Sequence, residues 1–138
     1  MKKALPLLFL VALPLFSAEP AASPTDAERA RWTMSDMRSI ATAIEAYATD
    51  HNRYPDAKDI ADVAKAVQPM YIRSTPLRDA WGNNFRIESN ASGYRIVSCG
   101  SDGVCDTTTW AVPAKDLGYS ADAVTQNGKM IRSWTYGK

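Results

Sequence analysis

The chain has 138 residues, with 16 Lys and Arg against 15 Asp and Glu, and a formal net charge of +1. A charge this close to zero gives no reason to expect nucleic acid or an anionic membrane surface as a partner. The length suits a single domain with a modest hydrophobic core.

The first 18 residues have the organisation of a secretory signal peptide. Lys2 and Lys3 precede an uncharged apolar run over residues 4–16, and small residues follow it. The run contains two prolines and is shorter than the roughly 20 apolar residues that a transmembrane helix needs. We therefore predict cleavage near Ala18. The mature protein should be exported, periplasmic or secreted, with no membrane anchor after processing.

Residues 19–25 are rich in Pro, Ala and Ser, and we predict them to be a flexible lead-in to a globular domain over residues 26–138. Thr25 or Asp26 can cap a helix at this boundary, because acidic residues follow in the first turn. Apolar residues then recur every three or four positions as far as Ala48, which predicts a long amphipathic helix with one buried face.

This helix should end near residues 50–52, because Pro55 disfavours helical backbone just before it. A shorter second helix is expected to begin at Asp56 and to stop before Pro69. Residues 70–84 contain the turn residues of an ordered loop.

Residues 85–89 and 94–100 alternate apolar and polar side chains around a turn-rich segment, which predicts a β-hairpin. Residues 110–112 indicate a short strand, and residues 130–136 indicate a closing edge strand. Because the helices precede the strands, the order predicts an α+β fold in which the long N-terminal helix packs on a small antiparallel sheet.

Both cysteines lie in one stretch, SCGSDGVCD, at residues 98–106. It could be a disulfide-closed turn, half of a metal-thiolate site or an oxygen-lined cation loop. Export favours a Cys99–Cys105 disulfide, because isolated cysteine pairs are usually oxidised outside the cytoplasm. A zinc site would need about four ligands in close spacing, and the only histidine, His51, lies far upstream.

The same stretch is rich in oxygen atoms of the kind that calcium prefers. Asp102 and Asp106 could supply two carboxylates, and serine and threonine hydroxyls lie beside them. Asp and Gly are also ordinary turn residues, so a solvated turn without a metal is the alternative.

Catalysis has little support in the sequence, and we expect no enzyme. His51 lies in a polar turn without a flanking nucleophile motif, so we expect it to be exposed at a helix end. The tryptophans could form a binding platform, but burial in a core is the commoner use of this side chain. They are Trp32, Trp81, Trp110 and Trp134.

Three segments in order, MRSIATAIEAYATDHNRYP, LRDAWGNNFRIES and GYRIVSCGSDG, resemble the G-type major pseudopilin of type II secretion systems. The resemblance covers the soluble domain of that family and implies a pseudopilin-like fold. It also implies calcium in the loop after the third segment, bound by a backbone carbonyl and acidic side chains. By motif, the carbonyl falls on Cys99, the first acid on Asp102, and the second on Asp106, with Thr107 beside it.

The N-terminus departs from this family. Prepilins carry a Gly before their processing site, whereas the first glycine here is Gly82. We therefore do not expect the protein to form filaments by itself. The resemblance implies a calcium-stabilised protein-interaction module whose partner lies in the cell envelope or secretion apparatus. The alternative is a secreted or periplasmic ligand-binding or enzymatic domain that reuses the fold.

Overall fold

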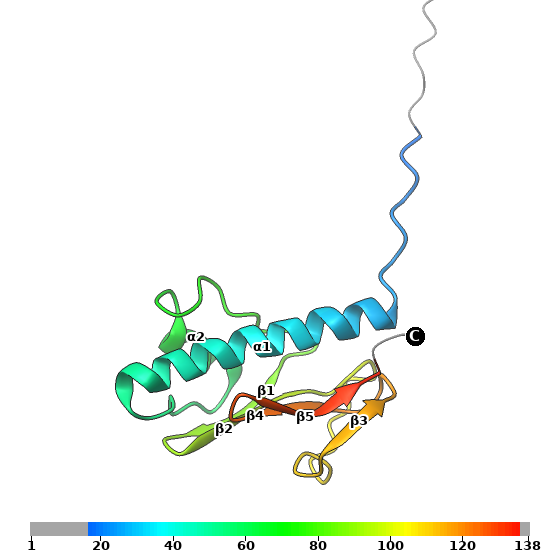
Figure 1. Ribbon diagram of the computed structural model, residues 1–138. Coiled ribbons are helices and arrows are strands. Elements are labelled where there is room, and N and C mark those ends of the chain that lie inside the picture. Colours follow the sequence, from blue (N-terminus) through cyan, green and yellow to red (C-terminus); the bar gives the residue numbers. More distant parts are fainter. Residues whose placement is uncertain (1–16, 136–138) are drawn as a thin grey trace, which may run out of the picture.

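The computed structural model describes residues 17–135, so most of the predicted signal peptide and the last three residues lie outside the described part. In Figure 1 the long helix lies over one face of a sheet, and the segment before it extends away from the domain. The elements in chain order are α1 (Asp26–His51), α2 (Ile60–Val67), β1 (Arg86–Asn90), β2 (Gly93–Ser98), β3 (Ala114–Leu117), β4 (Ala123–Gln126) and β5 (Lys129–Trp134).

Helix α1 begins and ends where the sequence predicts. The side chain of Thr25 accepts a hydrogen bond from the Glu28 backbone, and Glu28 bonds back to Thr25, which makes a capping box. Asn52 ends the helix with a left-handed backbone, φ 54°. The buried face is the predicted apolar one, and its residues are Ala30, Thr33, Met34, Met37, Ile40, Ala41, Ala43 and Ile44.

Helix α2 begins four residues later than predicted, at Ile60 rather than Asp56. Asp59 is the reason, because its side chain accepts a hydrogen bond from the Asp62 backbone at 2.9 Å and caps the helix there. Its buried residues are Ile60, Val63 and Val67. None of the helices among the described residues has the length and apolar character needed to cross a lipid bilayer.

The sheet has five strands in the order β1-β2-β4-β5-β3. The predicted hairpin is β1 and β2, and Ile87 lies opposite Ile96 in its register. The prediction of an antiparallel sheet was wrong in one place, because β3 pairs parallel to β5. For the same reason β5 is an internal strand and not the expected edge.

Residues 110–112, predicted to be a strand, form a turn instead. The Thr109 N–H bonds to the Asp106 carbonyl at 3.1 Å, and the Val112 N–H bonds to the Thr109 carbonyl at 2.9 Å. These local hydrogen bonds take the backbone groups that a strand would need. Trp110 therefore lies in a turn, and its buried side chain packs next to Val97 and Val124 of the sheet.

Two apolar clusters form on opposite faces of the sheet. The larger lies between the helices and the sheet and includes Met34, Met37 and Ile44 from α1. The smaller lies on the face away from α1 and contains Val97, Cys99, Trp110 and Val124. The disulfide loop therefore belongs to the second cluster, while α1 belongs to the first.

Candidate functional site: the disulfide-closed loop

The loop follows directly after β2 and contains the predicted disulfide. Cys99 and Cys105 are bonded, with their Cα atoms 4.7 Å apart. Cys99 is buried against the second cluster, and Cys105 is partly buried there. The bond therefore fixes both ends of the loop against the sheet and leaves residues 102–104 exposed at the surface.

Gly100 allows this loop to lie against the segment that precedes β4. Its φ is +75°, a conformation that favours glycine. A Cβ atom there would meet the Tyr119 carbonyl oxygen and would lie 2.7 Å from that of Ala121. The Ser101 N–H bonds to the same Tyr119 carbonyl at 2.8 Å. Gly100, the first glycine of the SCGSDG stretch, is thus required by packing.

Asp79 connects two of the sequence motifs. Its Oδ1 atom accepts hydrogen bonds from the backbone N–H groups of Trp81, at 3.1 Å, and Asn83, at 3.0 Å. Its Oδ2 atom accepts the hydroxyl of Ser98 at 2.7 Å, at a buried position. The DAWGN segment, residues 79–83, and the end of β2 are therefore held together by one carboxylate.

A surface cavity of about 340 Å³ lies beside the loop and contains three carboxylates and one guanidinium among its lining residues. Asp102 and Asp106 come from the loop, Asp122 immediately precedes β4, and Arg132 lies in β5. The other lining residues are Val104, Thr109, Ser120 and Ala121. With all four side chains charged, the carboxylates outnumber the cation, and the charge suits a cationic ligand.

The side chains of Asp102 and Asp106 each accept a hydrogen bond from the backbone N–H two residues further along the chain. The Oδ1 atom of Asp102 accepts the Val104 N–H at 2.9 Å. The Oδ1 atom of Asp106 accepts the N–H of Thr108 at 3.1 Å and its hydroxyl at 2.6 Å. Within the described part of the chain, the Oδ2 atom of each carboxylate takes part in no hydrogen bond, so each has one oxygen for a ligand.

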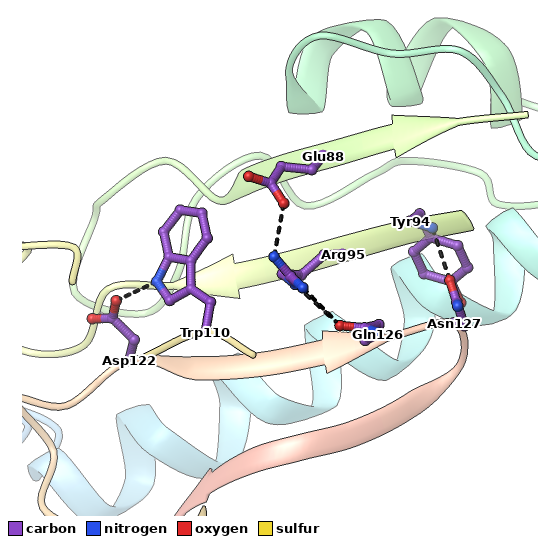
Figure 2. A network of polar contacts seen from close by, with 7 residues as sticks. All are labelled: Glu88, Tyr94, Arg95, Trp110, Asp122, Gln126 and Asn127. Carbon is purple, nitrogen blue, oxygen red and sulfur yellow. Dashed lines mark hydrogen bonds and ion pairs between the residues drawn. The ribbon is translucent and has the colours of Figure 1, made fainter. Parts of the chain in front are cut away.

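Sequence reasoning missed Asp122. It is 3% exposed, and its Oδ2 atom accepts the indole N–H of Trp110 at 2.6 Å, as Figure 2 shows, and the Asp106 N–H at 2.8 Å. The Nε of Arg132 donates to the Asp122 carbonyl at 3.2 Å. The only signal in the sequence is an aspartate immediately before three apolar or β-branched residues, which is too common to identify a site.

The four residues that the resemblance assigns to calcium are not all brought together. Asp102 and Asp106 line the cavity, whereas Cys99 and the exposed Thr107 do not. No group of three or more His, Cys, Asp or Glu residues among residues 17–135 is close enough to hold a metal ion. Calcium takes six to eight oxygen ligands, including carbonyls and water. The oxygen atoms at the cavity are of the kind that calcium prefers, but the carboxylates alone are too few to complete its coordination.

The other candidate residues lie in ordinary structural positions. His51 is exposed at the end of α1, and its ring stacks on that of Tyr47 with centroids 3.9 Å apart. Trp110 and Trp134 are buried, whereas Trp32 is 51% exposed on α1. Trp81 is partly buried and contacts Trp134 edge to face.

The comparisons with known proteins agree with the fold. The family described as type II secretion system protein G matches residues 22–112, which is well over half of the chain. A comparison with curated proteins gives no match. The matched range contains α1, α2, the β1–β2 hairpin and the disulfide loop. The long helix over a small sheet is the architecture that this family implies, and the chain belongs to the protein G family of type II secretion systems.

Proposed function

We propose that this protein is an exported, non-enzymatic interaction domain that binds other proteins of the type II secretion apparatus in the cell envelope. The family match over residues 22–112 carries this proposal, because protein G of these systems is a structural component that works by protein contacts. The basic start and short apolar run of residues 1–16 support export.

Calcium is the second part of the proposal: it binds at the disulfide-closed loop and stabilises it. The carboxylates of Asp102 and Asp106 are the protein ligands, and Asp122 adds negative charge beside them. An oxidised cysteine pair leaves oxygen atoms as the donors, which favours calcium over zinc. Calcium would supply no chemistry here beyond joining the loop to the segment before β4.

A thermal-shift experiment tests the calcium site. A ligand that binds only the folded state, at 100 times its dissociation constant, stabilises that state by about 2.7 kcal/mol. We expect a rise of several degrees in Tm with calcium and no comparable rise with magnesium. Asp102→Asn should abolish the rise, because asparagine keeps the acceptor for Val104 but removes the charge. Asp116→Asn is the matched control, since Asp116 is exposed on β3 and does not line the cavity.

Cells that carry a type II secretion system test export and binding. The N-terminus of the protein from a periplasmic or secreted fraction should begin near residue 19. A tagged full-length chain should co-purify with components of the apparatus, and the same preparation from cells lacking the apparatus genes is the control. Recovery of an intact Met1, or identical co-purifying proteins in both cells, would contradict this part.

A further inference from the structure

The outer edge of β1 is only partly covered. β1 is the first strand of the sheet and pairs with β2 on one side. On its other side, the Phe85 N–H bonds to the Leu77 carbonyl at 3.0 Å, and the Ser89 carbonyl accepts the Ala57 N–H at 3.3 Å. Ile87 lies midway between these two contacts. The edge is therefore covered at both ends and open at its centre.

The backbone of Ile87 faces this open edge. Backbone groups alternate in direction along an antiparallel strand, so every second residue bonds to the same side. Phe85 and Ser89 both bond away from β2, and Ile87 is two residues from each. Its N–H and C=O therefore point to the outer edge, where no described residue bonds to them. Such groups at a strand edge are a template for an added strand.

A groove of about 370 Å³ surrounds this position and extends to both faces of the sheet. Ile60 and Ile87 belong to the cluster under the helices, whereas Trp110 belongs to the cluster on the opposite face. The lining is Lys58, Asp59, Ile60, Ala61, Leu77, Asn84, Phe85, Arg86, Ile87, Glu88 and Trp110. The alternate side chains of an added strand would thus find apolar surface on one face and the Trp110 ring on the other.

The charges at the rim of the groove favour an acidic ligand. Glu88 is paired with Arg95 at 2.9 Å, as Figure 2 shows. Asp59 caps α2 and accepts the Asp62 N–H. Lys58 and Arg86 are exposed, and neither forms an ion pair with another residue in the range 17–135. The two acids are thus compensated, while the two cations are available.

We propose that this groove binds an extended peptide segment of a partner protein, which adds to β1 through the backbone of Ile87 and carries an apolar residue next to an acidic one. The residue opposite Ile87 would exchange two hydrogen bonds with it and place its side chain toward Ile60. The acidic neighbour would then lie on the other face, beside Arg86. This deepens the proposed interaction role and rests on it for the kind of partner.

A second copy of the chain fits the groove less well. Its own β1 edge would be recessed between its Leu77 and Ala57 segments, so two such edges cannot approach without a clash between those segments. A flexible peptide has no such flanks. An extended segment of another protein is therefore the occupant that the geometry favours.

Titration by NMR tests the proposal. The probe is a blocked heptapeptide with valine at its centre, threonine before it, glutamate after it, and glycine and serine at its ends, because the residue after the valine lies opposite Arg86 in an antiparallel pair. We expect its addition to shift the backbone amide of Ile87 more than amides outside the groove. A peptide with proline in place of the valine should bind at least tenfold more weakly, because it lacks the central N–H. An unmoved Ile87 amide at millimolar peptide would overturn the proposal.

Two matched pairs of variants locate the binding. Ala61→Trp fills the groove from the exposed side of α2 and should weaken peptide binding at least tenfold, whereas Ala91→Trp in the hairpin turn should not. Arg86→Glu should weaken binding similarly, whereas Arg73→Glu, outside the groove, should not. Equal affinity within either pair would count against the groove. Shifts at Ile87 that depend on protein concentration without peptide would instead identify a second copy as the occupant.

The outcome is separable from that of the proposed function. Neither the calcium shift in Tm nor co-purification with the apparatus requires the β1 edge, so both can succeed while peptide binding fails. Peptide binding can also succeed with a chain that shows no apparatus partner. Loss of co-purification in Ala61→Trp but not in Ala91→Trp would show that the apparatus partner binds through this groove. Its retention in both would show that the apparatus partner binds elsewhere.

Discussion

Residues 22–112, which match the family, and residues 113–135, which lie beyond the match, contribute to the fold in different ways. The first region supplies both helices and the β1–β2 hairpin, most of which sequence patterns predict. The second supplies three of the five strands. The two regions nevertheless share one sheet, because β4 pairs directly with β2 from Arg95–Gln126 to Ser98–Ala123. The end of the family match is therefore not the end of a folding unit.

The two regions also share their cores. Trp134 is completely buried, its ring contacts that of Trp81 at 5.2 Å between centroids, and its indole N–H bonds to the Ala121 carbonyl at 2.7 Å. Trp110, just inside the match, bonds to Asp122 beyond it. The second region therefore completes both apolar clusters and is not an addition to a domain that would be complete without it.

Trp134→Ala tests this dependence most strongly. Removing a fully buried tryptophan should lower the free energy of unfolding by about 3–5 kcal/mol, through lost apolar contact and a residual cavity. Denaturant unfolding monitored by circular dichroism measures the change. Trp32→Ala is the control, because that side chain is 51% exposed on α1 and should change stability by less than about 1 kcal/mol. Equal losses in the two variants would mean that the second region is not integral to the core.

Replacing both cysteines by alanine tests how firmly the loop holds the two regions together. A ring of this size should contribute about 2 kcal/mol by restricting the unfolded chain. Addition of a reductant to the wild-type protein should give the same loss, and the double variant should not respond to it. A loss confined to the loop, with an unchanged unfolding midpoint, would show that the rest of the fold does not depend on the disulfide.

The sequence predicts the first region well because its patterns are local. The capping residues Thr25 and Glu28 and the alternation in the hairpin each indicate one element within a short window. β4 has no such signal, because Ala123, Val124 and Thr125 are buried in succession between β2 and β5 and do not alternate. A strand that is buried in this way is recognised only when its neighbours are known.

The candidate site shows the same limit. Asp102 and Asp106 are found from the motif because they lie within the disulfide ring or beside it. Asp122 and Arg132 reach the same cavity only through the pairing of β4 with β5. Long-range pairing of this kind leaves no trace in the local sequence, so half of the charged lining could not be predicted.

Asp122→Asn tests the hydrogen bond between Trp110 and Asp122, which joins the two regions. Asparagine keeps one acceptor oxygen, but hydrogen bonds to a carboxylate are stronger than those to an amide. We expect a loss of about 1 kcal/mol, with a change in Trp110 fluorescence because the indole N–H bonds to this side chain. Asp116→Asn on the exposed edge strand is the control and should change neither property. An unchanged fluorescence spectrum in Asp122→Asn would contradict the contact between Trp110 and Asp122.

The smallest effect is expected at the start of α1, far from the second region in sequence and confined to the helix cap. The Oε2 atom of Glu28 accepts hydrogen bonds from the backbone N–H of Thr25, at 2.8 Å, and from its hydroxyl, at 3.0 Å. These bonds, and more weakly the charge of Arg31, lower the pKa of Glu28 below its ordinary value.

A lowered pKa in an acid means that the ionised form stabilises the folded state. This contribution is present above the unfolded pKa of about 4.3 and is lost as pH falls through the folded value. Wild type should therefore be slightly more stable than Glu28→Gln at pH 7, and the difference should shrink as the pH falls below the unfolded pKa and vanish once it is below the lowered folded pKa, as paired melting curves can show. Glu19→Gln, in the extended segment before the helix, removes the same charge and should match wild type at pH 7. A Glu28→Gln difference that persists unchanged in acid would show that the cap acts without its charge.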